Sequence, residues 1–206
     1  MTTQPHSYLA LGDSYTIGEG VPIQDSFPCQ TVQVLRSGGV AFTTPEIVAK
    51  TGWTTGELRD GIAAARLLPG YDFVSLLIGV NNEYRGRSRT EYAAEFEGLL
   101  LQAIGFAGGH PSHVFVLSIP DWSVTPFAHA NLPDQAGRSR EIVAREIDAF
   151  NASGREIAGK YQVDFIDITG HTRSHSWFAP DGLHPSGLEY RHWARLLAGR
   201  IMARIS

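Results

Sequence analysis

The sequence has a single cysteine and no long hydrophobic run. Because Cys29 is the one cysteine among 206 residues, an intramolecular disulfide and a cysteine-rich metal site are both excluded. No apolar run reaches the length of about 20 residues that a membrane-spanning helix needs. No positively charged leader with a long apolar segment precedes the first predicted strand, and we therefore expect a cytoplasmic protein.

The sequence also has no excess of positive charge. Its 17 Lys and Arg against 21 Asp and Glu give a formal net charge of -4, so nothing favours nucleic acid or an anionic membrane as a partner. An apolar fraction of 43% and a charged fraction of 18% are ordinary for a globular protein. The length fits a single domain over residues 1–206 with a full hydrophobic core. We find no repeat or interdomain linker, and no indication of the oligomeric state.

Short apolar runs alternate with amphipathic segments along the chain. The continuous apolar runs predict strands at residues 7–11, 45–50, 72–79, 112–120 and 163–168. The amphipathic segments predict helices at residues 26–38, 54–68, 88–109, 135–161 and 186–205. Apolar strands separated by helices favour a parallel sheet with helices on both faces. The longest irregular stretches, 121–134 and 169–185, each follow a strand, so we expect both at the ligand-binding edge of the sheet.

The first predicted strand runs into a glycine-rich turn that carries a serine. The stretch "LALGDSYTIGEG" begins at Leu9, and its glycines end the strand and force the chain to turn. Ser14 therefore follows the carboxyl end of the first strand, the edge at which open α/β sheets bind ligands. A serine at this edge is a candidate nucleophile, with a purely structural turn residue as the alternative. Its partners elsewhere in the chain decide between the two.

A short segment near the carboxyl end offers a base and an acid for this serine. In "APDGLHPSGLEY", Asp181 and His184 lie three residues apart in a loop rich in Pro and Gly. A serine hydroxyl is a poor nucleophile unless a base, usually histidine, accepts its proton, and a carboxylate on the other ring nitrogen holds the required tautomer. We therefore predict a catalytic triad of Ser14, His184 and Asp181. Asp13 has the poorer spacing to the histidine and is interpreted as a turn anchor.

Two further residues that follow predicted strands could donate hydrogen bonds to an oxyanion. Gly52 follows the second strand in "AKTGWTTGE", and its backbone N–H is accessible because glycine has no side chain. Asn81 follows the third strand in "LLIGVNNEY", and its side-chain amide could donate directly. Each could also be an ordinary turn residue, but their shared place at the sheet edge favours the oxyanion role.

Together these segments resemble the SGNH, or GDSL-type, hydrolase family of serine esterases and lipases. The family motifs correspond in order to "GDSYTIGEG" with Ser14, to Gly52, to "GVN" ending at Asn81, and to "DGLH". The resemblance implies a three-layer α/β/α sandwich with a five-stranded parallel sheet of the flavodoxin-like type. It also implies acyl-ester hydrolysis without a cofactor or metal, and an oxyanion hole made by the N–H groups of Ser14 and Gly52 and the Asn81 amide.

The chain departs from the family pattern at two positions. Tyr15 stands where Leu gives the family its name, and Asn82 stands where Asp is common, next to Asn81, whose orientation it can affect. Neither change removes a group that the chemistry needs. The resemblance implies a serine ester hydrolase that forms an acyl-enzyme, and the short loops of this small chain favour small or short-chain acyl esters. Lysophospholipase, thioesterase and carbohydrate O-acetylesterase activities share the same motifs and stay open.

Aromatic residues gather near these motifs in the sequence. Trp122, Phe127 and Trp177 lie on the two long irregular stretches, and Trp53 directly follows the candidate oxyanion glycine. We expect these four side chains to wall an acyl or leaving-group pocket, with simple loop packing as the alternative. Trp193 instead fits the apolar face of the last predicted helix and is expected in the core.

Two other interpretations fit the sequence less well. His171 and His175 lie four residues apart near Asp167, but the surrounding Gly and Pro disfavour a helix and no third ligand is suitably spaced, so we expect no metal site. A flavodoxin-like binding module would fit the predicted sheet but would leave the Asp-x-x-His and Gly-x-Asn segments unexplained. Its first loop also lacks the Gly-x-x-x-x-Gly-Lys pattern of a nucleotide phosphate site.

Overall fold

Five parallel strands form one sheet at the centre of the molecule. The computed structural model describes residues 4–132, 138–175 and 177–205. All strand pairings are parallel and the strand order is β2-β1-β3-β4-β5. The strands are β1 (Tyr8–Gly12), β2 (Glu46–Ala49), β3 (Phe73–Leu77), β4 (Val114–Leu117) and β5 (Asp164–Ile166). The predicted five-stranded parallel sheet of flavodoxin-like order is confirmed.

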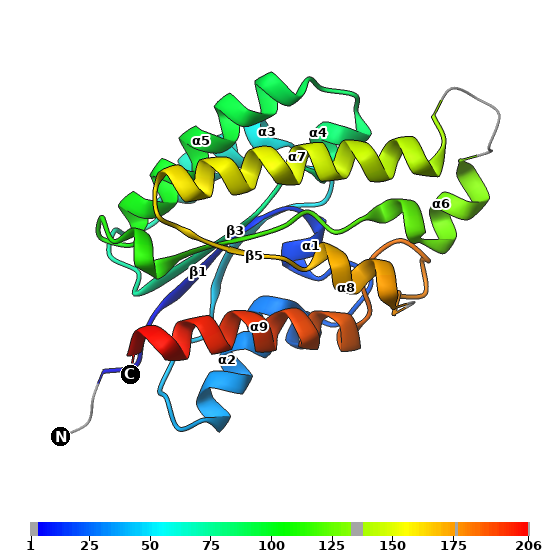
Figure 1. Cartoon of the computed structure of the whole chain (residues 1–206). Helices are drawn as coiled ribbons and strands as arrows, with labels where there is room; N and C mark the ends of the chain where they lie inside the picture. The colour runs from blue at the N-terminus through cyan, green and yellow to red at the C-terminus, as the bar shows by residue number, and fades with distance from the viewer. Residues whose placement is uncertain (1–3, 133–137, 176, 206) are drawn as a thin grey trace.

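Long helices cover both faces of the sheet and complete the three layers (Figure 1). One face carries α2 (Phe27–Ser37) and α9 (Gly187–Ile205), which pack on each other. The other face carries α3 (Thr55–Ala65), α5 (Arg89–Phe106) and α7 (Arg140–Lys160). Within the described ranges, no helix combines the length and the apolar character needed to cross a membrane.

Short helices gather beyond the carboxyl ends of the strands (Figure 1). They are α1 (Ser14–Ile17), α4 (Val80–Tyr84), α6 (Pro126–Asn131) and α8 (Thr169–Ser174). Three single 3-10 turns complete the described elements, namely η1 (Ile23–Asp25), η2 (Pro111–His113) and η3 (Trp122–Val124). The stretches 121–134 and 169–185 are therefore only partly irregular, because η3, α6 and α8 lie within them. Helices of one or two turns are too short to produce a periodic hydrophobic pattern.

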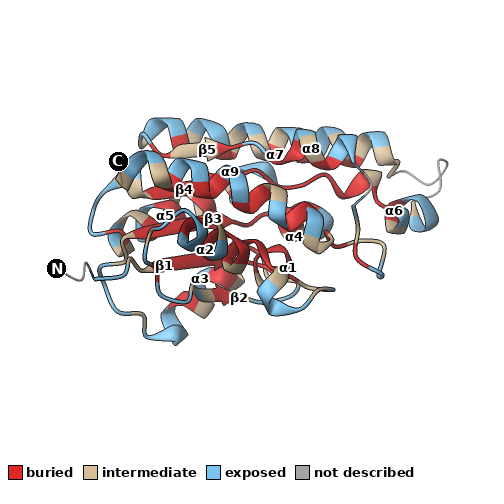
Figure 2. Ribbon diagram, turned by 90° about the horizontal axis from the view of Figure 1, so that it is seen from below, coloured by how far each residue is buried: buried red, intermediate tan, exposed pale blue. Residues whose placement is uncertain are grey.

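Burial follows the expected pattern of a sheet covered on both faces. Every residue of β1, β3 and β4 is buried, whereas the edge strands β2 and β5 are only partly buried. Figure 2 shows the buried strands between helices whose outer sides are exposed. The apolar runs of β1, β3 and β4 thus correspond to strands that have no solvent-facing side.

The helix boundaries are set mainly by hydroxyl caps. Thr54 begins α3 with a capping box, in which its side chain accepts from the Glu57 N–H and the Glu57 carboxylate accepts from the Thr54 N–H. Ser139 caps α7, so this helix begins later than the predicted residue 135. Residues 135–137 of that prediction lie outside the described residues.

The last helix is anchored by a fully buried tryptophan. The Trp193 side chain is completely buried, lies 6.1 Å from the Phe27 ring of α2, and donates from Nε1 to the buried Glu189 carboxylate at 2.8 Å. Tyr15, next to the candidate nucleophile, lies edge-on to the same indole at 6.2 Å. The prediction that Trp193 belongs to the core is confirmed, and its ring links α9 to the turn after β1.

Replacing this anchor should destabilise the whole domain. We expect Trp193→Ala to lower the free energy of unfolding by about 3–5 kcal/mol, because it leaves a cavity and removes a donor from a buried carboxylate. Urea unfolding followed by circular dichroism measures this change. The control is Leu196→Ala on the same helix, whose partly exposed side chain should cost less than about 1 kcal/mol. Equal losses for the two variants would contradict the assignment.

Candidate active site

The register of three neighbouring strands brings the candidate residues to one place. Gly12 at the end of β1 pairs with Ala49 of β2 and with Leu77 of β3. The chain leaves all three strands at the same level, and the following turns carry Ser14, Gly52 and Asn81 respectively. A cavity of about 220 Å³ is lined by Ser14, Gly52, Asn81 and His184 together.

Ser14 begins a single helical turn directly after the sheet. Asp13 is the N-cap of α1, and its Oδ1 accepts from the Tyr15 N–H at 3.1 Å. Ser14 is the first residue of α1, so no carbonyl of a preceding helical turn can accept a hydrogen bond from its N–H. This N–H is therefore available to a ligand. The close approach of Gly12 to its neighbours explains the glycine, since a Cβ there would lie 2.4 Å from the Leu77 carbonyl oxygen.

Asp181 and His184 form a compact hydrogen-bonded pair. His184 Nδ1 lies 2.7 Å from Asp181 Oδ2, while Oδ1 of the same carboxylate accepts from the backbone N–H groups of Leu183 and His184, each at 2.9 Å. Burial alone would raise the pKa of the Asp181 carboxyl, but these donors hold it below its ordinary value. The carboxylate therefore stays ionised beside the imidazole, which suits it to orient the ring and stabilise an imidazolium.

The loop that carries this pair is held by backbone hydrogen bonds on both sides. Within it, the Ala179 N–H donates to the His184 carbonyl at 2.7 Å. Gly182 adopts a φ of 68°, which favours glycine, and its carbonyl accepts from the Phe127 N–H of α6 at 2.9 Å. Tyr15 lies edge-on to the His184 ring, with centroids 5.8 Å apart. These contacts fix the imidazole against α1.

The turn that carries Gly52 is pinned from outside by an arginine. Gly52 has a φ of 80°, a conformation that favours glycine, and the Trp53 N–H closes the turn on the Lys50 carbonyl at 3.2 Å. Arg85 Nη2 donates to the Gly52 carbonyl at 2.6 Å, and Arg85 Nη1 donates to the Glu57 carboxylate. No role for Arg85 in the site was predicted from the sequence, because its partners lie about 30 residues away.

Asn81 is oriented by the same turn. Its Nδ2 donates to the Trp53 carbonyl at 3.0 Å, and because a primary amide carries two N–H donors, one stays available for the cavity. Asn82 points elsewhere: its Oδ1 accepts from the Thr55 N–H at 3.0 Å and its Nδ2 donates to the Thr55 hydroxyl at 2.7 Å. Asn82 thereby joins α4 to the start of α3 and holds Asn81 in place through the backbone.

The walls of the cavity are mostly apolar. Trp122 and Phe127, two of the four aromatic residues predicted for the pocket, line it. The other lining residues lie within or beside the motifs, but the sequence did not predict that they would face the cavity. These lining residues are Tyr15, Thr51, Val80, Tyr84 and Leu183. Tyr84 and Leu183 lie within three residues of Asn81 and Asp181, and this proximity was the available signal.

Trp53 and Trp177 do not line this cavity. The Trp53 ring lies over Gly61 of α3, where an added Cβ would come within 2.2 Å of the indole, so Trp53 contributes to the site only through its carbonyl. Trp177 is about 40% exposed, and its ring lies 4.9 Å from His175 and 5.4 Å from His171. The expectation that these two side chains wall the pocket is therefore wrong for the cavity described.

His171 lies on α8, so the argument that no helix forms there is wrong. Its Nδ1 lies 2.9 Å from each oxygen of the buried Glu189 carboxylate, and its ring stacks on His175 and His192 at centroid distances of 3.9 and 3.6 Å. Among the residues that the structure describes, no three or more His, Cys, Asp or Glu side chains are arranged to hold a metal ion.

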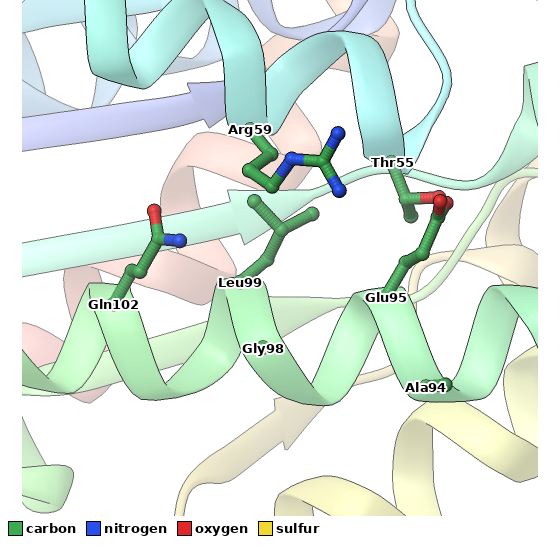
Figure 3. Close-up of a pocket in the computed structure, with 7 residues that line it drawn as sticks. All are labelled: Thr55, Arg59, Ala94, Glu95, Gly98, Leu99 and Gln102. Carbon is green, nitrogen blue, oxygen red and sulfur yellow. The ribbon is translucent and has the colours of Figure 1, made fainter.

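A separate cavity of about 270 Å³ lies between α3 and α5 (Figure 3). Figure 3 shows the Thr55 and Glu95 side chains meeting across it, where the Thr55 hydroxyl donates to the Glu95 carboxylate. Its lining includes none of the residues predicted for the active site. The cavity bounded by Ser14 and His184 is therefore the one in which the candidate catalytic groups meet.

Solved structures with the same fold include three bacterial hydrolases. A lipase/acylhydrolase from Enterococcus faecalis is 17% identical, with a TM-score of 0.69 over 97% of this chain and 96% of that one. The esterase EstA from a Pseudoalteromonas species is 14% identical (TM-score 0.72, 97% and 98% covered). The carbohydrate acetylesterase Est24 from Sinorhizobium meliloti is 21% identical (TM-score 0.68, 96% and 99% covered). No curated protein sequence matches the chain.

The family is shown by the sequence itself. The family description "GDSL-like Lipase/Acylhydrolase" matches residues 10–192, a span that begins within β1 and contains strands β2 to β5 and every candidate residue from Ser14 to His184. The match to a family of hydrolases contradicts the alternative that this chain is a non-catalytic, flavodoxin-like binding module. This chain belongs to the GDSL-like lipase/acylhydrolase family and is a carboxylic ester hydrolase.

Proposed function

We propose that this protein is a serine hydrolase of small or short-chain acyl esters that works through an acyl-enzyme on Ser14. The observation that carries the proposal is that Ser14, His184, Gly52 and Asn81 line one cavity, with His184 bonded to Asp181 on its far ring nitrogen. A nucleophile, a base with its orienting carboxylate, and oxyanion donors are the parts that acyl transfer needs.

In the first half of the proposed reaction, Ser14 attacks the acyl carbonyl. His184 Nε2 accepts the hydroxyl proton, because Nδ1 is committed to Asp181 at 2.7 Å. Negative charge develops on the former carbonyl oxygen, which accepts hydrogen bonds from the N–H groups of Ser14 and Gly52 and from the free N–H of the Asn81 amide. The imidazolium then gives its proton to the leaving alcohol as the ester C–O bond breaks.

In the second half, water replaces the alcohol. His184 accepts a proton from the water as its oxygen attacks the acyl-enzyme carbonyl, and the same donors hold the second oxyanion. The Ser14 oxygen leaves with the proton from His184, and the carboxylic acid is released. Asp181 stays ionised throughout and stabilises the transient imidazolium.

The size of the cavity supports the choice of short esters. Its volume of about 220 Å³ is below the roughly 300–1,000 Å³ of typical ligand pockets, and Trp122 and Phe127 are among its apolar walls. A long acyl chain would have to leave part of its length in water. Est24, with which the chain shares its fold, is a carbohydrate acetylesterase, and acetylated sugars are therefore the first natural esters to test.

Removing the proposed nucleophile should abolish turnover. We expect Ser14→Ala to lower kcat for p-nitrophenyl acetate by at least about 10⁴-fold, because no other group can form the acyl-enzyme. Initial rates with purified protein measure the loss, and circular dichroism checks the fold. The control is Ser37→Ala at the exposed end of α2, which should keep wild-type rates. A Ser14→Ala variant with wild-type activity would refute the proposed nucleophile.

Changing the acid of the pair tests the proposed tautomer. In Asp181→Asn, the amide would present an N–H to His184 Nδ1, so that the ring proton moves to Nε2 and the base cannot accept the Ser14 proton. We expect kcat to fall by about 10⁴-fold with little change in KM. The exposed Asp60→Asn on α3 serves as the control. A loss of less than tenfold would remove Asp181 from the triad.

A series of acyl-chain lengths tests the substrate class. We expect kcat/KM for p-nitrophenyl esters to be highest for acetate or butyrate and to fall by at least about tenfold at octanoate, because the extra methylenes do not fit the cavity. Palmitate should not be hydrolysed. A maximum at octanoate or beyond would contradict the short-chain proposal and point to a lysophospholipase or thioesterase. A preference for acetylated sugars over p-nitrophenyl acetate would identify a carbohydrate O-acetylesterase.

A further inference from the structure

The indole that walls the cavity is held by a buried carboxylate. Trp122 is almost fully buried, and its Nε1 donates to Glu83 Oε2 at 2.7 Å. Glu83 is itself only 2% exposed. Glu83 lies on α4, which follows β3, whereas Trp122 lies on η3, which follows β4. This hydrogen bond therefore joins the segment that carries Asn81 to the wall of the cavity.

Arg138 forms an ion pair with the Glu83 carboxylate at the oxygen that does not accept from the Trp122 indole. Its Nη2 bonds Glu83 Oε1 and also donates to the Glu83 carbonyl at 3.0 Å, while its Nη1 donates to the Tyr84 carbonyl at 2.8 Å. The guanidinium carbon lies 5.7 Å from the Trp122 ring centroid and 5.9 Å from that of Tyr84, within cation–π range. Glu146 of α7 lies 3.6 Å from the same Nη2 on the solvent side.

Two opposing effects act on the ionised form of the Glu83 carboxyl. Burial raises the pKa of the Glu83 carboxyl to about 7, although the Trp122 N–H and the Arg138 charge act in the opposite direction. A neutral acceptor would hold an indole N–H at a lower desolvation cost. The ion pair with Arg138 connects the Glu83 carboxylate, and through it the indole, to the residues just before α7. A neutral acceptor would not form this charged link.

A second ion pair fixes the backbone next to the indole. Asp121 Oδ1 accepts from the Ser123 N–H at 2.9 Å, and its Oδ2 accepts from Arg173 Nε at 2.7 Å. Arg173 also pairs with Asp148 of α7. The backbone of η3 is thus held from α8, while the rotation of the Trp122 ring is controlled by Glu83. Loosening Glu83 would free the ring without releasing the η3 turn.

We propose that Glu83, clamped by Arg138, is a positioning residue for ester selectivity that fixes the Trp122 indole as the wall limiting the length of the acyl chain. This inference rests on the proposed function, because it assigns the cavity beside Ser14 to the acyl group. When the hydrogen bond is lost, the indole turns away and the cavity lengthens. Longer acyl chains then gain relative to acetate, since the oxyanion donors and the triad are not part of the clamp.

The experiment measures the ratio of kcat/KM for p-nitrophenyl hexanoate to that for acetate. In Glu83→Gln, the amide has one acceptor oxygen for the two donors Trp122 Nε1 and Arg138 Nη2, which each use a separate carboxylate oxygen in the wild type. The ion pair is lost and the clamp loosens, so this ratio should rise about tenfold, the size expected from loosening one hydrogen bond to a charged group. Trp122→Phe, which keeps a ring but loses the N–H, should raise it similarly. Glu97→Gln is the matched control and should leave the ratio unchanged. Glu97 of α5 accepts from Lys160 and Tyr161 at the carboxyl-terminal end of α7, so it has similar chemistry away from the cavity.

A double-mutant cycle separates positioning from a general structural effect. In the Trp122→Phe background, Glu83→Gln should leave the ratio unchanged within about twofold, because the N–H it would release is already gone. An independent increase in that background, or an unchanged ratio in both folded single variants, would overturn the clamp. If Glu83→Gln does not fold, Trp122→Phe alone decides, and an unchanged ratio in it overturns the proposal.

The same assays separate this inference from the function on which it rests. Turnover by wild type that is lost in Ser14→Ala, together with an unchanged hexanoate-to-acetate ratio in the variants, would refute the clamp and leave the esterase proposal standing. Wild-type protein that hydrolyses neither ester, and does not react with a serine-directed phosphonate, would refute the proposed function and the clamp with it.

Discussion

The site depends first on the parallel register of β2, β1 and β3. Gly12 stands opposite Ala49 on one side and Leu77 on the other, so that three turns leave the sheet at one level. A shift of register would separate these turns, and each one carries a different candidate group. The packing around Gly12 enforces this closeness, since the Leu77 carbonyl and the Thr16 side chain occupy the space of a Cβ. A side chain at this position would push β1 and β3 apart.

The proposed base, His184, and its partner Asp181 reach the same place by a less local route. Their loop follows β5 and α8, and it is tied to α6 by the Phe127 N–H and to α2 by Gln30 Nε2, which donates to the Gly187 carbonyl at 2.8 Å. Trp193 then joins the helix after the loop to the ring of Tyr15. The distance between the proposed nucleophile and the proposed base is therefore set by packing on one face of the sheet. Destabilising α9 would disturb the site as well as the core.

The sequence predicted the parts of the molecule that local patterns encode. Continuous apolar runs located the five strands, and the Asp-x-x-His spacing located the pair that is hydrogen-bonded in the structure. Contacts between distant segments were not predictable. The Trp53 ring turns onto α3 because Gly61 leaves room for it, and Arg85 reaches back to the Gly52 turn. The short helices also escaped prediction, because one or two turns have no periodicity and are stabilised by their tertiary contacts.

Two aspartates close to the cavity show how environment separates their roles. Asp181 accepts hydrogen bonds from the N–H groups of Leu183 and His184 and from the His184 ring, and its pKa is lowered. Asp13 is completely buried, and its Oδ1 accepts from the Tyr15 N–H, while burial raises the pKa of its carboxyl to about 7. Environments that push two pKa values apart assign different tasks to chemically identical groups. The ionised Asp181 can balance an imidazolium, whereas a fully charged Asp13 beside Ser14 would oppose a developing oxyanion. The spacing argument from the sequence and the electrostatics of the structure therefore both favour Asp181 as the proposed acid of the triad.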